Sequence, residues 1–131
     1  MDLWRCGTMS QMQVLERVEG TVTVVTLAGD LALGSAEEVR DRLAGLVRGA
    51  VGEGRRDLLL DLAGVDFMDS MGLRVLIHVF RRVQEAGGRM ALSAVQPRAG
   101  RALDVTGLNA SLDIYSTTEE ALTALRRPAG R

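Results

Sequence analysis

The side chains that could do chemistry gather in one stretch, where Ser70 directly follows Asp69 and lies downstream of Asp61 and Asp66. A serine hydroxyl at such a place can accept a phosphate or cap a helix. The spacing of the three carboxylates matches no calcium-binding loop. The only histidine, His78, lies about two helical turns further along, too far to activate the serine as a base. We therefore expect neither a catalytic site nor a bound metal.

The rest of the sequence narrows the classes of function further. No loop of the pattern G-x-x-x-x-G-K-[ST] is present to bind a nucleotide. The 16 basic residues nearly balance the 17 acidic ones, which is not typical of a nucleic-acid binder. No apolar run approaches the ~18 residues of a transmembrane helix, and the single cysteine, Cys6, cannot form an intramolecular disulfide. We expect a cytoplasmic protein that is no enzyme and has no cofactor, no direct nucleic-acid contact and no membrane span.

The length of 131 residues suits one domain, which we place at 12–127. We expect a flexible leader at 1–11, which contains Trp4, and a tail at 128–131. Continuous or alternating apolar runs predict strands at 12–18, 21–28, 57–62, 89–94 and 112–115. Four helical patterns alternate with the later strands and give a β-β-α-β-α-β-α-β-α order. The prediction is an α/β fold, in which helices pack on a small mixed sheet.

Short signals mark where the expected elements begin and end. Glu19-Gly20 is a two-residue hairpin signal, and Ser35 with Glu38 has the spacing of a capping box. A short helix is expected to begin at Pro97 and end at Gly107, and Thr117 with Glu120 is expected to cap the last helix. Gly64 marks a turn after the buried strand at 57–62. We expect an acidic loop from there to the next helix, which brings the three aspartates around the serine.

The helix that follows Asp69 and Ser70 is strongly amphipathic. Both residues are good N-caps, so the serine has a purely structural interpretation as a cap beside its interpretation as a phosphate acceptor. Five apolar side chains share the arc that should face the core: Leu73, Leu76, Ile77, Phe80 and Val83. The opposite side carries Arg74 and His78, with Met71 beside them and Val75 at the margin. An exposed methionine beside cationic residues is typical of a docking surface.

Residues 61–73, DLAGVDFMDSMGL, closely resemble the phosphorylation-site signature of the STAS-domain anti-sigma factor antagonists. That signature reads D-[LF]-[SA]-x-[VL]-x-[FY]-[MI]-D-S-[ST]-G-[LI]. Two other segments resemble the family, Gly29-Asp30-Leu31 and the LDVTGL stretch at 103–108. The chain departs from the family at Met71, where Ser or Thr is usual, and at Ala32, where an acidic residue is usual.

The resemblance implies a STAS-like fold and a regulator that is switched by phosphate at Ser70. Unphosphorylated, the domain would bind an anti-sigma factor, a serine kinase of the GHKL type, and so free a sigma factor. The kinase would then phosphorylate Ser70 and release the domain, and a PPM-type phosphatase would reset it. We expect a monomer or weak homodimer. The expected partner-binding residues are Asp30, Asp66, Asp69, Met71, Arg74, Val75 and His78.

A second class of function stays open on the sequence alone. STAS domains also serve as accessory subunits of transporters, as stressosome scaffolds and as sensors of small ligands, without a phosphorylation switch. The complete D-S-x-G-L motif argues against most of these, whereas Met71 and Ala32 keep them open.

Overall fold

The computed structural model describes residues 12–126, and the predicted leader and tail lie outside this range, together with Trp4 and Cys6. Within it the chain forms a five-stranded sheet and four α-helices in the predicted order. The elements are β1 (Gln13–Glu19), β2 (Val22–Leu31), α1 (Ala36–Gly52), β3 (Asp57–Met68), α2 (Ser70–Glu85), β4 (Met90–Ser93), α3 (Pro97–Thr106), the 3₁₀ turn η2 (Leu108–Ala110), β5 (Asp113–Tyr115) and α4 (Thr118–Arg126).

The sheet is mixed, as predicted. Its strands lie side by side in sequence order from β1 to β5. The β1–β2 pair is antiparallel, because a tight turn through Gly20 and Thr21 joins the two strands. Every later pair is parallel, because a helix carries the chain back to the other end of the sheet each time.

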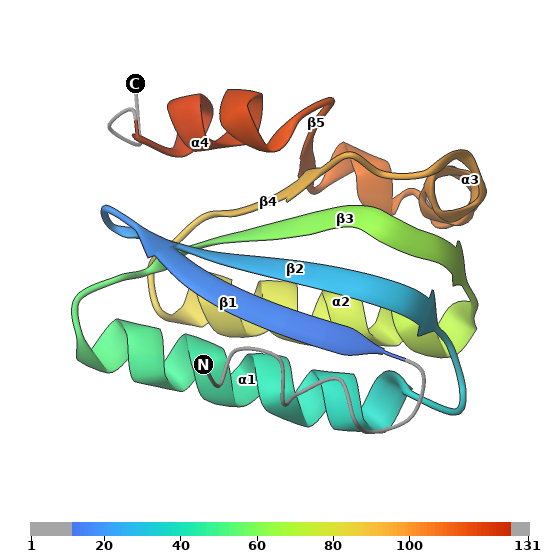
Figure 1. Cartoon of the computed structure of the whole chain (residues 1–131), viewed down its shortest axis with the longest axis horizontal. Coiled ribbons are helices and arrows are strands. Elements are labelled where there is room, and N and C mark those ends of the chain that lie inside the picture. Colours follow the sequence, from blue (N-terminus) through green and yellow to red (C-terminus); the bar gives the residue numbers. More distant parts are fainter. Residues whose placement is uncertain (1–11, 127–131) are drawn as a thin grey trace.

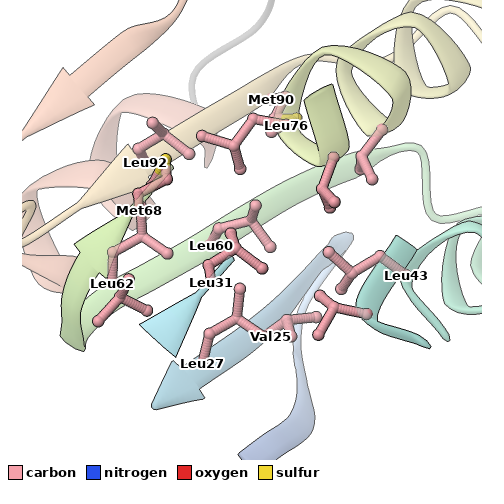
Figure 2. Close-up of a cluster of buried hydrophobic side chains, with 14 of the residues drawn as sticks. Val25, Leu27, Leu31, Leu43, Leu60, Leu62, Met68, Leu76, Met90 and Leu92 are labelled. Atoms are coloured by element: carbon pink, nitrogen blue, oxygen red, sulfur yellow. The ribbon is translucent and has the colours of Figure 1, made fainter. Parts of the chain in front are cut away.

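The helices cover the two faces of the sheet unequally. Helices α1 and α2 lie along one face, α4 lies on the other, and α3 packs beside β3 (Figure 1). The larger core therefore forms between the sheet and the α1–α2 pair. Figure 2 shows part of it, with side chains from β2 and β3 pointing toward Leu43 of α1 and Leu76 of α2. A smaller core lies beneath α4 and contains Val22, Val24, Leu59, Ala91, Ala121, Leu122 and Leu125.

Strand β3 is longer than predicted and continues to Met68, so the expected acidic loop after residue 62 is wrong. Its pairing with β2 shifts register twice, between Thr26 and Ala28 and again between Gly29 and Asp30. Such bulges interrupt the two-residue alternation that identifies a strand in a sequence. Buried side chains in this half of β3 accordingly recur at every third position: Leu62, Val65 and Met68.

Gly64 lies inside the bulged strand and not at a turn. It is paired with Ala28 of β2. A Cβ atom at residue 64 would lie 2.8 Å from the Ala28 Cβ. Glycine is therefore needed here because the two strands approach closely, which the sequence alone does not distinguish from a turn.

The buried side of α2 is broader than the predicted arc, and the placement of Val75 on the exposed face is wrong. Val75 is only 2% exposed, and Val79 is fully buried. Ile77 and Phe80, predicted to face the core, are half-buried. The reason is that α2 packs against α1 as well as against the sheet, which draws a second row of its side chains inward.

The predicted capping box at the start of α1 does not form. Ser35 is the N-cap residue, but its side chain accepts no hydrogen bond from the helix. Its Oγ donates to the Asp30 carbonyl at 2.7 Å and accepts from the Ala32 N–H at 3.2 Å. Ser35 therefore stabilises the loop before the helix and not the helix itself.

The predicted cap of the last helix is confirmed. The Thr117 Oγ1 accepts a hydrogen bond from the Glu120 N–H at 3.1 Å, which satisfies a donor that the helix start leaves free. The short helix α3 begins at Pro97 and is capped at its C-terminal end by Gly107, in agreement with the predicted limits. Gly107 has φ +78°, a left-handed conformation that glycine adopts at low cost.

Candidate functional site

Asp69 caps helix α2, and Ser70 is the first residue of that helix. The Asp69 Oδ1 accepts hydrogen bonds from the N–H groups of Met71 at 2.9 Å and Gly72 at 3.1 Å. These are two of the donors that a helix start leaves without an intrahelical partner. Because the aspartate performs the capping, the purely structural interpretation of Ser70 as the cap is wrong.

Ser70 is exposed to solvent. Its hydroxyl forms no hydrogen bond within residues 12–126. A serine at a helix start normally uses its side chain to satisfy a backbone donor, and here that role is already filled. The Ser70 Oγ is thus both accessible and uncommitted, as an acceptor of a phosphoryl group must be.

Gly72 lets helix α2 start close against the end of β2. A Cβ atom at Gly72 would clash with the Leu31 carbonyl oxygen and lie 2.7 Å from the Met68 Cγ. The Leu31 oxygen also accepts a hydrogen bond from the Asp69 N–H at 3.3 Å. This close approach fixes where the helix begins and therefore where Ser70 lies.

The second carboxylate oxygen of Asp69 holds the loop between β2 and α1. The Leu33 N–H donates to the Asp69 Oδ2 at 3.1 Å, across 36 residues of sequence. One side chain therefore links three features: the end of β3, the start of α2 and the loop that follows β2. Ser70 is directly adjacent to this link.

Asp66 and Asp30 lie at the same end of the sheet, and both are exposed. The Asp66 carboxylate lies 3.8 Å from the Arg98 guanidinium of α3, which also stands 5.6 Å above the ring of Phe67. Asp30 is opposite Phe67 in the β2–β3 pairing. The predicted site residues Asp30, Asp66 and Asp69 thus lie at the same end of the sheet as Ser70.

A groove of about 250 Å³ runs between α1 and α2, next to the serine. Its lining includes Met71, Arg74 and His78, and Val75 forms part of its buried floor. Neither Arg74 nor His78 has an ion-pair partner within the described range, whereas Arg40 on the α1 side pairs with Asp41 at 3.1 Å. The groove therefore presents the uncommitted side chains of Arg74 and His78 beside an apolar floor.

Asp61 does not join Ser70, contrary to the sequence prediction. Its Oδ1 accepts from the Ala63 N–H at 3.0 Å, and its Oδ2 accepts from the Thr118 hydroxyl at 3.1 Å. The Thr118 oxygen lies 2.9 Å from the hydroxyl of Ser93, which is fully buried. Thr118 begins α4, so Asp61 fastens that helix to the opposite face of the sheet.

Two other kinds of site, a metal site and a membrane-spanning helix, are absent from the described residues. Among its His, Cys, Asp and Glu side chains, no three are grouped so as to hold a metal ion. None of its helices combines the length and the apolar character that crossing a membrane requires.

Three residues of this end of the molecule were missed from the sequence: Leu33, Phe67 and Arg98. Leu33 and Phe67 are apolar yet 73% and 38% exposed. The sequence predicts a loop at Phe67, whereas this residue lies in the bulged end of β3. The position of Leu33 depends on a hydrogen bond to a residue distant in sequence, and no local pattern signals it.

The chain is similar to known proteins of one family. The STAS domain family matches residues 11–121. The chain is 35% identical over 95 residues to the anti-sigma-B factor antagonist of Bacillus subtilis (strain 168), a match that covers 72% of this chain and 83% of that protein. It is 33% identical over 104 residues to the anti-sigma F factor antagonist of Paenibacillus polymyxa, covering 79% and 86%.

A solved structure supports the same relationship. The crystal structure of an anti-sigma factor antagonist from Mycobacterium paratuberculosis superposes with a TM-score of 0.77 at 26% identity, over 88% of this chain and 95% of that one. Anti-sigma factor antagonists are non-enzymatic regulators. By family match, sequence identity and fold, the chain belongs to the STAS-domain family of anti-sigma factor antagonists.

Proposed function

We propose that this domain binds an anti-sigma factor that is a serine kinase of the GHKL type, and so frees a sigma factor. Phosphorylation of Ser70 by that kinase ends the binding, and a PPM-type phosphatase restores it. The family supports the first part, because the related proteins are named as antagonists of anti-sigma factors. The observation that carries the second part is the exposed Ser70 hydroxyl, which has no partner in the described residues because Asp69 caps the helix.

The chemistry of the switch is a phosphoryl transfer. The Ser70 Oγ attacks the γ-phosphorus of ATP bound to the kinase, the serine loses its proton and ADP departs. The nucleotide, its magnesium ion and the base that takes the proton all belong to the kinase. This domain contributes a hydroxyl that is free to enter a foreign active site.

The fold tolerates phosphate at Ser70. The group would point into solvent from the first position of α2, where the helix dipole favours negative charge. It adds about −1.5 to −2 charge at pH 7. That charge and bulk lie beside the carboxylates of Asp69 and Asp66, on the surface that the kinase must cover. We therefore expect phosphorylation to break the interface and leave the domain folded.

The partner surface extends from Ser70 along α2. Met71, Arg74 and His78 line the groove between α1 and α2, where the Arg74 guanidinium is available to pair with a carboxylate of the kinase and the His78 ring to hydrogen-bond with the kinase. Asp30 and Asp66 lie at the rim, where charges mainly steer association. Val75 contributes to the floor through packing and not through direct contact.

Mass spectrometry after incubation with the anti-sigma kinase and Mg-ATP tests the proposal. The wild-type domain should gain one phosphoryl group, and peptide mapping should place it on Ser70. Ser70→Ala should gain none, while Ser111→Ala, which removes another exposed serine, should behave as wild type. Stable binding without phosphate transfer would instead favour the second class, a STAS binding module without a switch.

A further inference from the structure

Leu33 is an apolar side chain that the fold holds out in solvent. It lies in the loop between β2 and α1 and is 73% exposed. Single exposed apolar side chains are common on folded proteins, and Val105 is even more exposed at 81%. What distinguishes Leu33 is that its backbone is held in a fixed position beside Ser70.

The backbone around Leu33 is fixed by hydrogen bonds on both sides. The Ala32 carbonyl accepts from the N–H groups of Ser35 at 2.9 Å and Ala36 at 2.8 Å, and the Ser35 hydroxyl bonds back to Asp30. The Leu33 N–H itself is bound to the Asp69 carboxylate. The exposure of the side chain is therefore a property of a preorganised turn.

The same carboxylate places Leu33 beside the serine. Asp69 Oδ2 lies 3.1 Å from the Leu33 nitrogen, and Ser70 is the next residue after Asp69. A kinase that encloses the Ser70 hydroxyl must cover the surface around it. An interface of ordinary size extends over about 800 Å² on each partner, far beyond one side chain.

We propose that Leu33 is an apolar anchor that enters a pocket on the anti-sigma kinase, and that Asp69 is the residue that positions it. This inference rests on the proposed function, because the occupant is the protein that phosphorylates Ser70. Interfaces draw most of their affinity from a few well-packed side chains held in place before binding. Leu33 thus contributes to the selection of the partner, since only a surface with a matching apolar pocket gains from it.

Titration calorimetry of the anti-sigma kinase with Leu33→Ala tests the anchor. Because the side chain is exposed, the variant should fold as wild type and bind at least about tenfold more weakly. Val18→Ala is the matched control, since Val18 is 49% exposed at the other end of the sheet, where the β1–β2 hairpin lies (Figure 1). It should bind within about twofold of wild type. Equal binding by both variants would overturn the inference.

Asp69→Asn tests the positioning role. Asparagine caps helices about as well as aspartate, so the start of α2 should persist. With its oxygen on the helix, its amide nitrogen is a donor and cannot accept from the Leu33 N–H. We expect a small fall in the melting temperature from the lost Leu33 hydrogen bond, faster hydrogen exchange at the Leu33 amide by NMR, and weaker binding. Unchanged exchange would refute the positioning role.

The two proposals fail in different ways. If wild type neither binds the kinase nor is phosphorylated by it, the proposed function falls and the anchor falls with it. If wild type binds and is phosphorylated while Leu33→Ala binds equally well, only the anchor falls.

Discussion

Asp61 and Asp69 lie eight positions apart in one motif, yet their carboxylates hold different parts of the fold. Asp61 closes a polar chain with Thr118 and the buried Ser93, on the face that α4 covers. Asp69 divides its two oxygens between the start of α2 and the Leu33 loop, beside an exposed serine. The first carboxylate stabilises packing, and the second organises a surface.

The difference lies in which groups each carboxylate leaves available. Around Asp61 the hydroxyls are used up, because Thr118 donates to the carboxylate and Ser93 must then donate to Thr118. Around Asp69 the backbone donors are satisfied while the side chain of Ser70 stays free. The Asp69 region therefore combines a backbone fixed by hydrogen bonds with an uncommitted serine side chain.

The largest expected effect comes from Gly72→Ala, which disturbs the Asp69 region at its closest contact. The added methyl group would meet the Leu31 carbonyl oxygen, so the helix start or β2 must move. We expect a loss of about 3 kcal/mol in the free energy of unfolding. Urea unfolding followed by circular dichroism measures it. Gly49→Ala, in α1 with open space around it, should instead stabilise by about 0.5–1 kcal/mol.

Thr118→Val breaks the Asp61 region and should have the next largest effect. The change keeps the shape and removes the hydroxyl, which leaves the buried Ser93 without its partner. We expect a loss of about 1–3 kcal/mol in stability, with phosphorylation of Ser70 unaffected. Thr123→Val is the control in the same helix, because that exposed hydroxyl only bonds the Glu119 carbonyl. A slower phosphorylation of Thr118→Val would show that the two regions are coupled.

Asp69→Ala and Ser70→Ala separate capping from phosphate acceptance. Asp69→Ala should lose about 1–2 kcal/mol of stability, because two N–H groups of α2 and the Leu33 N–H lose their acceptor. Ser70→Ala should stay within about 0.5 kcal/mol of wild type, because the removed hydroxyl makes no bond in the described range. Thermal melts of both variants check this order. A larger loss of stability for Ser70→Ala than for Asp69→Ala would show that the serine caps the helix.

Much of this fold was predictable from local patterns. Apolar runs and helix signals predict the order of elements, the start of α3 at Pro97 and the cap at Thr117 correctly. The prediction failed where distant residues decide the outcome. The bulges of β3 depend on its pairing with β2, and the burial of Val75 depends on α1.

In the candidate site, too, local patterns predicted some residues correctly and failed where distant residues meet. The motif identified Ser70 and Asp69, because adjacent residues define a helix start. It wrongly grouped Asp61 with them, since a strand and not a loop separates the two aspartates. It also missed Leu33, whose neighbour Asp69 lies 36 residues away.

The central claim is that charge at Ser70 breaks the partner interface without unfolding the domain. Calorimetric titration of the anti-sigma kinase with Ser70→Asp and Ser70→Ala tests it most directly. Both variants should melt near the wild-type temperature. Ser70→Asp should bind the kinase poorly, while Ser70→Ala should bind as wild type and resist release by ATP. Wild-type binding and ATP-driven release for both variants would contradict the account.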